Sequence, residues 1–146
     1  MEKAGISECT PDATCVFVYS LTTAFLDWST ISDKELTLKT VFLIALASGK
    51  RRSELHAFSR ADVTFDEGDT SGMTLKPAAS FISKTHMKTR GIGALKPVFI
   101  PSLPVQAADT QDDELLCPVR CMKQYLLVSD AFRSPSQERL FIPWTP

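Results

Sequence analysis

The spacing of the apolar residues changes near Asp62, and no other feature of the sequence limits the fold as much. Before this point, apolar residues recur at the spacing of one face of a helix. After it, Val63 and Phe65 alternate with polar residues, as in a half-buried strand. We therefore expect an α+β fold that is mainly helical and contains a small antiparallel sheet of three strands.

Two helical segments are predicted between Ser32 and Phe58. Ser32 and Glu35 fit a capping box, in which the serine oxygen and the glutamate side chain satisfy the first free amides of a helix. We expect this helix to end at Gly49, because glycine permits the turn that a following short helix over 51–58 needs. The residues that we expect the first helix to bury are Leu36, Val41, Phe42, Ala45 and Leu46.

Short strands are predicted in the segment that follows. The candidates lie around Met73 to Leu75, Phe81 to Ser83 and Pro97 to Ile100. The connection over 84–93, between the last two candidates, is basic and contains glycine. This composition is typical of a mobile hairpin loop.

The C-terminal part is predicted to contain a linker, a helix and the start of another strand. Residues 101–113 resemble a linker in composition, and Leu140 to Ile142 are the strand candidate. Acidic residues precede the helix, at the end where the helix dipole favours them. These acids are Asp112, Asp113 and Glu114, and the helical spacing follows in Leu115, Leu116, Val119, Met122, Tyr125 and Leu126.

The N-terminal segment is polar at first and then dense in apolar residues. Residues 1–13 are expected to form a loose lead-in, and 16–28 have helical spacing. The β-branched residues Thr14, Val16 and Val18 favour a strand as an alternative to a helix there. We accordingly divide the chain into a lead-in and first helix over 1–30 and one domain over 31–146.

The composition is that of an ordinary globular domain. The chain has 146 residues, of which 44% are hydrophobic and 23% are charged. Its formal net charge of -1 argues against a protein that coats nucleic acid by bulk electrostatics. Local basic patches can still carry phosphate contacts.

The cysteines and the apolar runs argue against a metal site and a membrane segment. The four cysteines show no CxxC spacing, and only two histidines accompany them, so we expect reduced thiols, no metal and no cofactor. The run from Val41 to Ala47 is too short to cross a bilayer, and no signal peptide is visible. We expect an intracellular protein, in the nucleus or outside it.

The segment from Ala47 to Val63 carries a known pattern. It has a small residue, glycine, arginine, Glu-Leu and a later aspartate, at Gly49, Arg51, Glu54, Leu55 and Asp62. In type and spacing this resembles the first signature of the tyrosine recombinases, the phage-integrase family. Within that family, the sequence of this segment is most similar to recombinases carried by DIRS-like and Crypton-like mobile elements.

The resemblance implies roles for the residues of this segment. Arg51 would stabilise charge on the transition state of DNA cleavage, because a guanidinium can fork onto two phosphate oxygens. Glu54 would support the fold around it, and Arg52 would contact DNA. The alternative is that the residues from Lys50 to Arg52 form an ordinary solvated turn, because runs of charged residues are usually exposed to solvent.

The predicted hairpin around Lys84 also resembles the family. Lys84 occupies the place of the family's catalytic lysine, which is thought to protonate the departing 5′-oxygen of DNA. No acidic residue lies between Thr70 and Ala108, so this region is locally positive. We expect His86, Lys88 and Arg90 to contact the phosphate backbone of double-stranded DNA. Taken alone, Lys84 reads as an ordinary hairpin lysine.

The family needs further residues that this sequence does not contain. A weaker match over 116–142 is followed by no His-x-x-Arg motif and no nucleophilic tyrosine. Tyr125 lies on an apolar helical stripe, so we interpret it as a core or boundary residue. The resemblance, over roughly 36–142, therefore implies the first half of a recombinase catalytic domain, which does not cut DNA alone.

Two readings of function stay open at this point. The first is a recombinase relic from a mobile element, whose intact version would perform DNA recombination and integration. The second is a non-enzymatic domain for protein interaction or DNA contact, or an unrelated α+β domain. Self-association is also expected, because helices absent from a half domain would leave apolar faces exposed.

Overall fold

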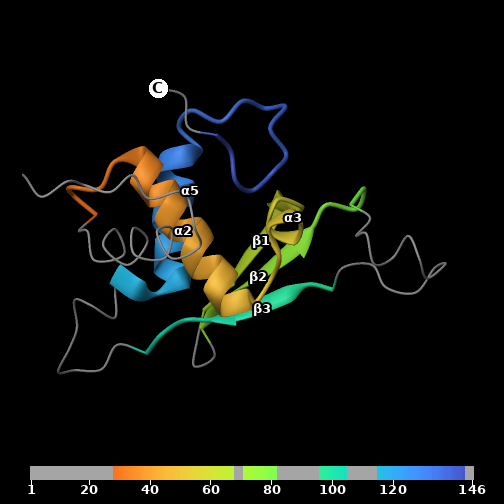
Figure 1. Cartoon of the computed structure of the whole chain (residues 1–146), viewed down its shortest axis with the longest axis horizontal. Coiled ribbons are helices and arrows are strands. Elements are labelled where there is room, and N and C mark those ends of the chain that lie inside the picture. Colours follow the sequence, from red (N-terminus) through yellow and green to blue (C-terminus); the bar gives the residue numbers. More distant parts are fainter. Residues whose placement is uncertain (1–27, 68–70, 82–95, 105–114, 144–146) are drawn as a thin grey trace, which may run out of the picture.

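The computed structural model describes residues 28–67, 71–81, 96–104 and 115–143 (Figure 1). In chain order the elements are α2 (Asp33–Ser48), α3 (Arg52–Leu55), β1 (Phe58–Asp66), β2 (Gly72–Pro77), β3 (Val98–Pro101) and α5 (Pro118–Ser129). The expected α+β class is thereby confirmed. The three strands form one antiparallel sheet in the order β1-β2-β3.

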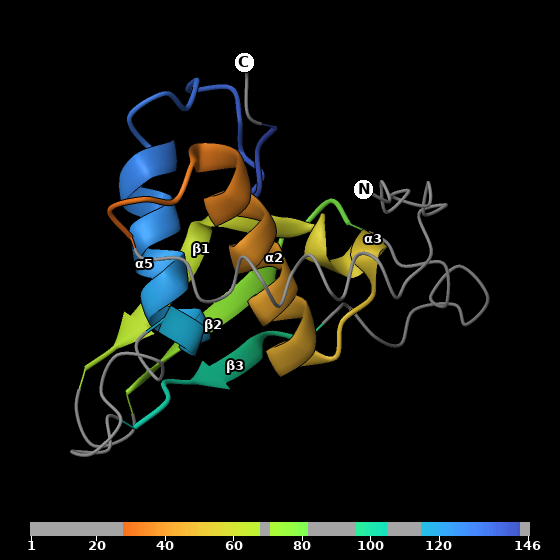
Figure 2. The same ribbon diagram turned by 60° about the vertical axis from the view of Figure 1, so that its left-hand side comes forward.

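The helices α2 and α5 pack beside each other against one face of the sheet, as Figure 2 shows. Between these layers lies one apolar core, in which Ile44, Met73, Leu75 and Met122 are all 0% exposed. Strand β1 is irregular between Phe58 and Val63, where its register with β2 shifts. The first residues of β1 are therefore offset from the regular ladder that its second half forms with β2.

The predicted capping box begins α2. The Ser32 hydroxyl accepts a hydrogen bond from the Glu35 amide at 3.3 Å, and the Glu35 carboxylate accepts one from the Ser32 amide at 3.0 Å. Gly49 ends the helix with φ of 63°, a left-handed conformation that glycine adopts without steric cost. The hydrogen bonds that Ser32 donates to the Glu35 carboxylate also keep the pKa of Glu35 below its ordinary value.

The buried face of α2 matches the prediction in part. Val41, Phe42 and Ala45 are partly buried against the core as expected, whereas Leu43 and Ile44 are buried and were not predicted. Leu36 is buried as expected, but Leu46 is 68% exposed. Thr37 and Thr40 are buried in its place, and their hydroxyls donate to carbonyls one turn earlier, both at 2.7 Å. Because threonine can satisfy its hydroxyl in this way, it can occupy a core face that a search for apolar residues misses.

Two predicted elements differ in the structure. The short helix ends at Leu55 rather than Phe58, and Phe58 begins β1. Phe81 lies outside any strand, and Ser83 lies outside the described residues. Most of 16–28, the loop over 84–93 and the acids at 112–114 also lie there.

The segment over 140–142 is held beside β1 without becoming a strand. The Leu140 amide donates to the Phe58 carbonyl at 2.8 Å, and the Arg60 amide donates to the Glu138 carbonyl at 2.9 Å. Ser59 and Arg139 form an isolated bridge between these two hydrogen bonds. The C-terminal segment is thus attached to the offset beginning of β1, next to α3.

The predicted C-terminal helix is α5. It begins with Pro118, a position where proline is favoured because its missing N–H has no partner in the first turn of a helix. Its apolar stripe is buried as expected at Val119, Met122, Tyr125 and Leu126. Among the helices that the structure describes, none combines the length and the apolar character that crossing a membrane needs.

Candidate functional site

Arg51 lies between α2 and α3, just after the glycine turn. Its amide donates to the Glu54 carboxylate at 2.8 Å, and its carbonyl accepts from the Glu54 amide at 2.9 Å. Glu54 thus fixes the main chain of Arg51. The guanidinium takes no part in this cap and is exposed.

An open hollow of about 470 Å³ lies beside Arg51. Among the described residues, Arg51, Arg52, Ser53 and His56 line it, and none of these four carries a carboxylate. Both arginines are exposed. A hollow of this kind offers charged donors to an anion, and a phosphate is the anion that arginine binds in a forked geometry.

Some of the predicted site residues belong to another part of the chain. Lys84, His86, Lys88 and Arg90 all lie outside the described residues. The convergence of Arg51 and Lys84 on one phosphate, which the resemblance implies, therefore stays a prediction.

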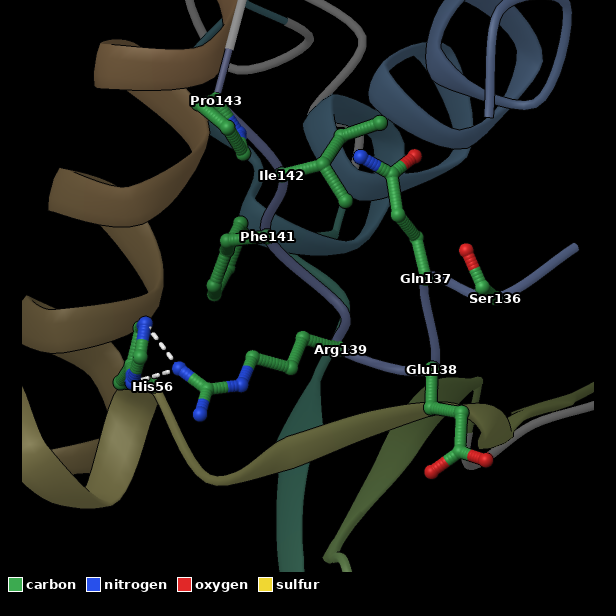
Figure 3. A pocket seen from close by; sticks show the side chains of 8 residues that line it. All are labelled: His56, Ser136, Gln137, Glu138, Arg139, Phe141, Ile142 and Pro143. Carbon is green, nitrogen blue, oxygen red and sulfur yellow. Dashed lines mark hydrogen bonds between the residues drawn. The ribbon is translucent and has the colours of Figure 1, made fainter. Parts of the chain in front are cut away.

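Arg139 is a residue of this region that the sequence did not indicate. Its side chain extends from the C-terminal segment toward His56, and its Nη1 contacts the imidazole (Figure 3). The two residues are 83 positions apart in the chain. No short-range pattern in the sequence joins residues this far apart.

Arg133 holds the loop from which Arg139 extends. Its guanidinium donates to the main-chain carbonyls of Gln137 at 3.2 Å, Arg139 at 2.6 Å and Leu140 at 2.9 Å. It also forms a salt bridge with Asp130 at 3.2 Å. One side chain therefore fixes the course of the main chain on both sides of Arg139.

Asp130 connects this loop to the sheet. Its carboxylate accepts a hydrogen bond from Arg60 Nε at 3.1 Å and is paired with both Arg60 and Arg133. Hydrogen bonding from Arg60 keeps the pKa of Asp130 below its ordinary value, and the same hydrogen bond raises the pKa of Arg60. The carboxylate is therefore charged at neutral pH, as this network requires.

Tyr125 is a core residue, as the sequence predicted. It is 2% exposed, donates to the Leu140 carbonyl at 3.3 Å and accepts from the Ile142 amide at 3.1 Å. Burial raises the pKa of its phenol. A protonated hydroxyl with two main-chain partners is suited to holding the C-terminal segment and not to attacking phosphorus.

The two described cysteines are buried free thiols. Cys121 lies 3.2 Å from the Thr40 hydroxyl, and burial raises the pKa of Cys121 to about 11. A thiol in this state is a weak metal ligand and a weak nucleophile. Within the described ranges no group of histidine, cysteine and acidic residues is arranged to hold a metal ion.

A comparison of the chain with protein-family models, with curated proteins and with solved structures finds no match.

Proposed function

We propose that the chain binds the phosphate backbone of double-stranded DNA through Arg51, as a domain of the tyrosine-recombinase type. The observation that carries this proposal is that Glu54 holds the main chain of Arg51 while the guanidinium of Arg51 stays exposed. The glutamate side chain caps the main chain at 2.8 Å and leaves the arginine side chain exposed beside a hollow that no acidic residue of the described ranges lines. That arrangement suits an arginine that is held in place and directed at an anion.

The local charge supports the same conclusion. The chain as a whole has a formal charge of -1, so a basic hollow here is not the consequence of a generally basic surface. Arg52 adds a second cation to the wall. In the proposed complex Lys84 and the basic residues His86, Lys88 and Arg90 supply further phosphate contacts.

The proposed activity is DNA contact and not strand cleavage. Transfer of a phosphoryl group needs an attacking atom, and a recombinase uses a tyrosine hydroxyl for this step. Tyr125 is buried and hydrogen-bonded. The other tyrosine, Tyr19, belongs to the segment before α2 and not to the place where the family has its nucleophile.

Replacing Arg51 with alanine is expected to weaken DNA binding. Each phosphate contact contributes about 0.9 to the slope of log K against log salt concentration, so the slope should fall in magnitude by about that amount. The affinity at low salt should fall roughly tenfold, as expected when a charged hydrogen-bonding group is lost. Fluorescence anisotropy of a labelled duplex at several salt concentrations measures both quantities, with Lys84→Ala as a second test variant.

The matched control is Lys123→Ala, which removes one positive charge from α5. The ammonium group of Lys123 lies 5.2 Å from the centroid of the Phe65 ring, near the end of β1 that is remote from α3. This variant should bind DNA like the wild type. Equal salt slopes for the wild type and Arg51→Ala, or binding that does not depend on salt, would contradict the proposal.

Self-association is a second candidate function, favoured by exposed apolar side chains. Leu46 on α2 is 68% exposed, and Leu127 on α5 is 73% exposed. Both helices lie in the same layer, so apolar contacts between two chains are available there. Light scattering should detect a dimer that Leu127→Glu weakens, and a wild-type chain that stays monomeric at high concentration rejects this candidate.

A further inference from the structure

Three hollows meet at the imidazole of His56. One is the hollow of Arg51 and Arg52, and a second contains Phe141 and Arg139. The third, of about 310 Å³, includes Ser53, Ser80 and Arg139. Because His56 lines all three, the hollow beside Arg51 and the two that include Arg139 are neighbours around this residue.

Arg139 is a cation without a carboxylate partner among the residues that the structure describes. The ion pairs there join Arg60 and Arg133 to Asp130, and neither includes Arg139. Its side chain has one hydrogen-bonding partner in those ranges, the imidazole of His56, which Nη1 contacts. A guanidinium has five N–H donors, so Nε and Nη2 keep theirs for another ligand.

The neighbouring acid does not neutralise this cation. Figure 3 shows the Glu138 carboxylate pointing away from the guanidinium of Arg139, on the other side of the main chain from His56. Two hollows are lined by both Arg139 and His56. Glu138 is among the residues that line the first, whereas the second is lined by Ser53 and Ser80 and, among the described residues, by no acidic side chain. Hydroxyl, imidazole and guanidinium groups are the donors that proteins direct at phosphate oxygens.

We propose that Arg139 and His56 form a binding position for a second phosphate group, next to that of Arg51. The guanidinium forks onto two phosphate oxygens, and the imidazole lies beside it. Ser53 lines both hollows, so the two positions share a wall. The inference rests on the proposed function, because the second phosphate is a neighbouring phosphate of the DNA that Arg51 binds.

The position of Arg133 explains how an exposed arginine is kept in this orientation. Its hydrogen bonds to the carbonyls of Gln137, Arg139 and Leu140 hold the main chain that carries Arg139. The bridge between Ser59 and Arg139 adds a main-chain connection to β1. Because these contacts use the main chain of Arg139, its side chain can be replaced without breaking them.

Two measurements on the full chain test the proposal with Arg139→Gln. The first follows the imidazole resonances of His56 by NMR during titration with inorganic phosphate at constant pH and ionic strength. A His56→Gln variant assigns these resonances against those of His86. The second measures binding of a labelled duplex at several salt concentrations. Lys123→Gln is the charge-matched control in both, and thermal unfolding verifies that each variant is folded.

The expected result is that phosphate shifts the His56 resonances in the wild type and in Lys123→Gln but not in Arg139→Gln. DNA affinity of Arg139→Gln should be roughly tenfold lower, with the salt slope reduced by about 0.9. The proposal is overturned if Arg139→Gln retains the phosphate response, or if phosphate does not shift His56 in the wild type.

The two proposals fail in different ways. If the wild type binds duplex in an Arg51-dependent manner while Arg139→Gln binds equally well, the second position is wrong and the proposed function stands. If inorganic phosphate shifts His56 through Arg139 but no duplex binds, the phosphate position is supported and DNA is not its carrier.

Discussion

Replacing Phe58 with alanine is expected to lower the free energy of unfolding by about 3 to 5 kcal/mol. Phe58 is 1% exposed and belongs to the apolar core, at the start of β1. Truncation removes the transfer free energy of the ring and leaves a cavity that the surrounding helices and strands fill only in part. Urea denaturation followed by circular dichroism gives the change.

Phe132→Ala is the control for this prediction. It removes the same ring from a side chain that is 44% exposed, so the loss should stay below about 1 kcal/mol. Equal losses in the two variants would mean that the core does not extend to the start of β1.

Replacing Arg133 with methionine is expected to destabilise the protein by about 3 kcal/mol. The side chain is 10% exposed and donates to three carbonyls as well as to Asp130. Methionine keeps much of the volume but leaves these acceptors without their charged donor. Denaturant unfolding measures the loss, and the duplex titration should show weaker binding because the loop that carries Arg139 loosens.

Asp130→Asn separates the two contributions of Arg133. It removes the charge on the salt bridge and leaves the hydrogen bonds from Arg133 to the carbonyls of Gln137, Arg139 and Leu140 in place. Because Asp130 is 41% exposed, its ion pairs are screened by solvent, and the variant should be destabilised less than Arg133→Met. A larger loss for Asp130→Asn would show that the ion pairs, and not the carbonyl contacts, hold the loop.

The pKa of Asp130 adds a pH dependence to the same network. Its folded-state pKa lies below the ordinary value, so the stabilisation is present at neutral pH and is lost as the pH falls through that lowered pKa. Asp130→Asn should therefore flatten the acid side of the stability profile.

Elements with local signals could be predicted from the sequence, whereas those made by distant contacts could not. Ser32, Glu35 and Gly49 define α2 through hydrogen bonds and backbone conformation within the segment itself. Phe58 was assigned to a helix, because its strand conformation depends on pairing with Pro77 and Leu140, which are remote in the sequence. The buried face of α2 was predicted in part, and Thr37 and Thr40 were missed because their hydroxyls are satisfied by carbonyls of the same helix.

The candidate site divides in the same way. Arg51 and Glu54 lie in one turn, so the contact between them is local, and their spacing in the sequence was sufficient to single out both residues. The pairing of His56 with Arg139 depends on the course of the loop that Arg133 holds, and that course follows from main-chain hydrogen bonds. No composition or period in the sequence encodes such bonds.

Strand β3 has a consequence for how copies of the chain can meet. It contains four residues, ends at Pro101 and follows Pro97. An incoming strand needs a row of amide donors, and proline offers none, so this border of the sheet is a poor template for lateral growth. Ordered fibre formation through that border is disfavoured, and pairing of two copies is expected to proceed through helix side chains.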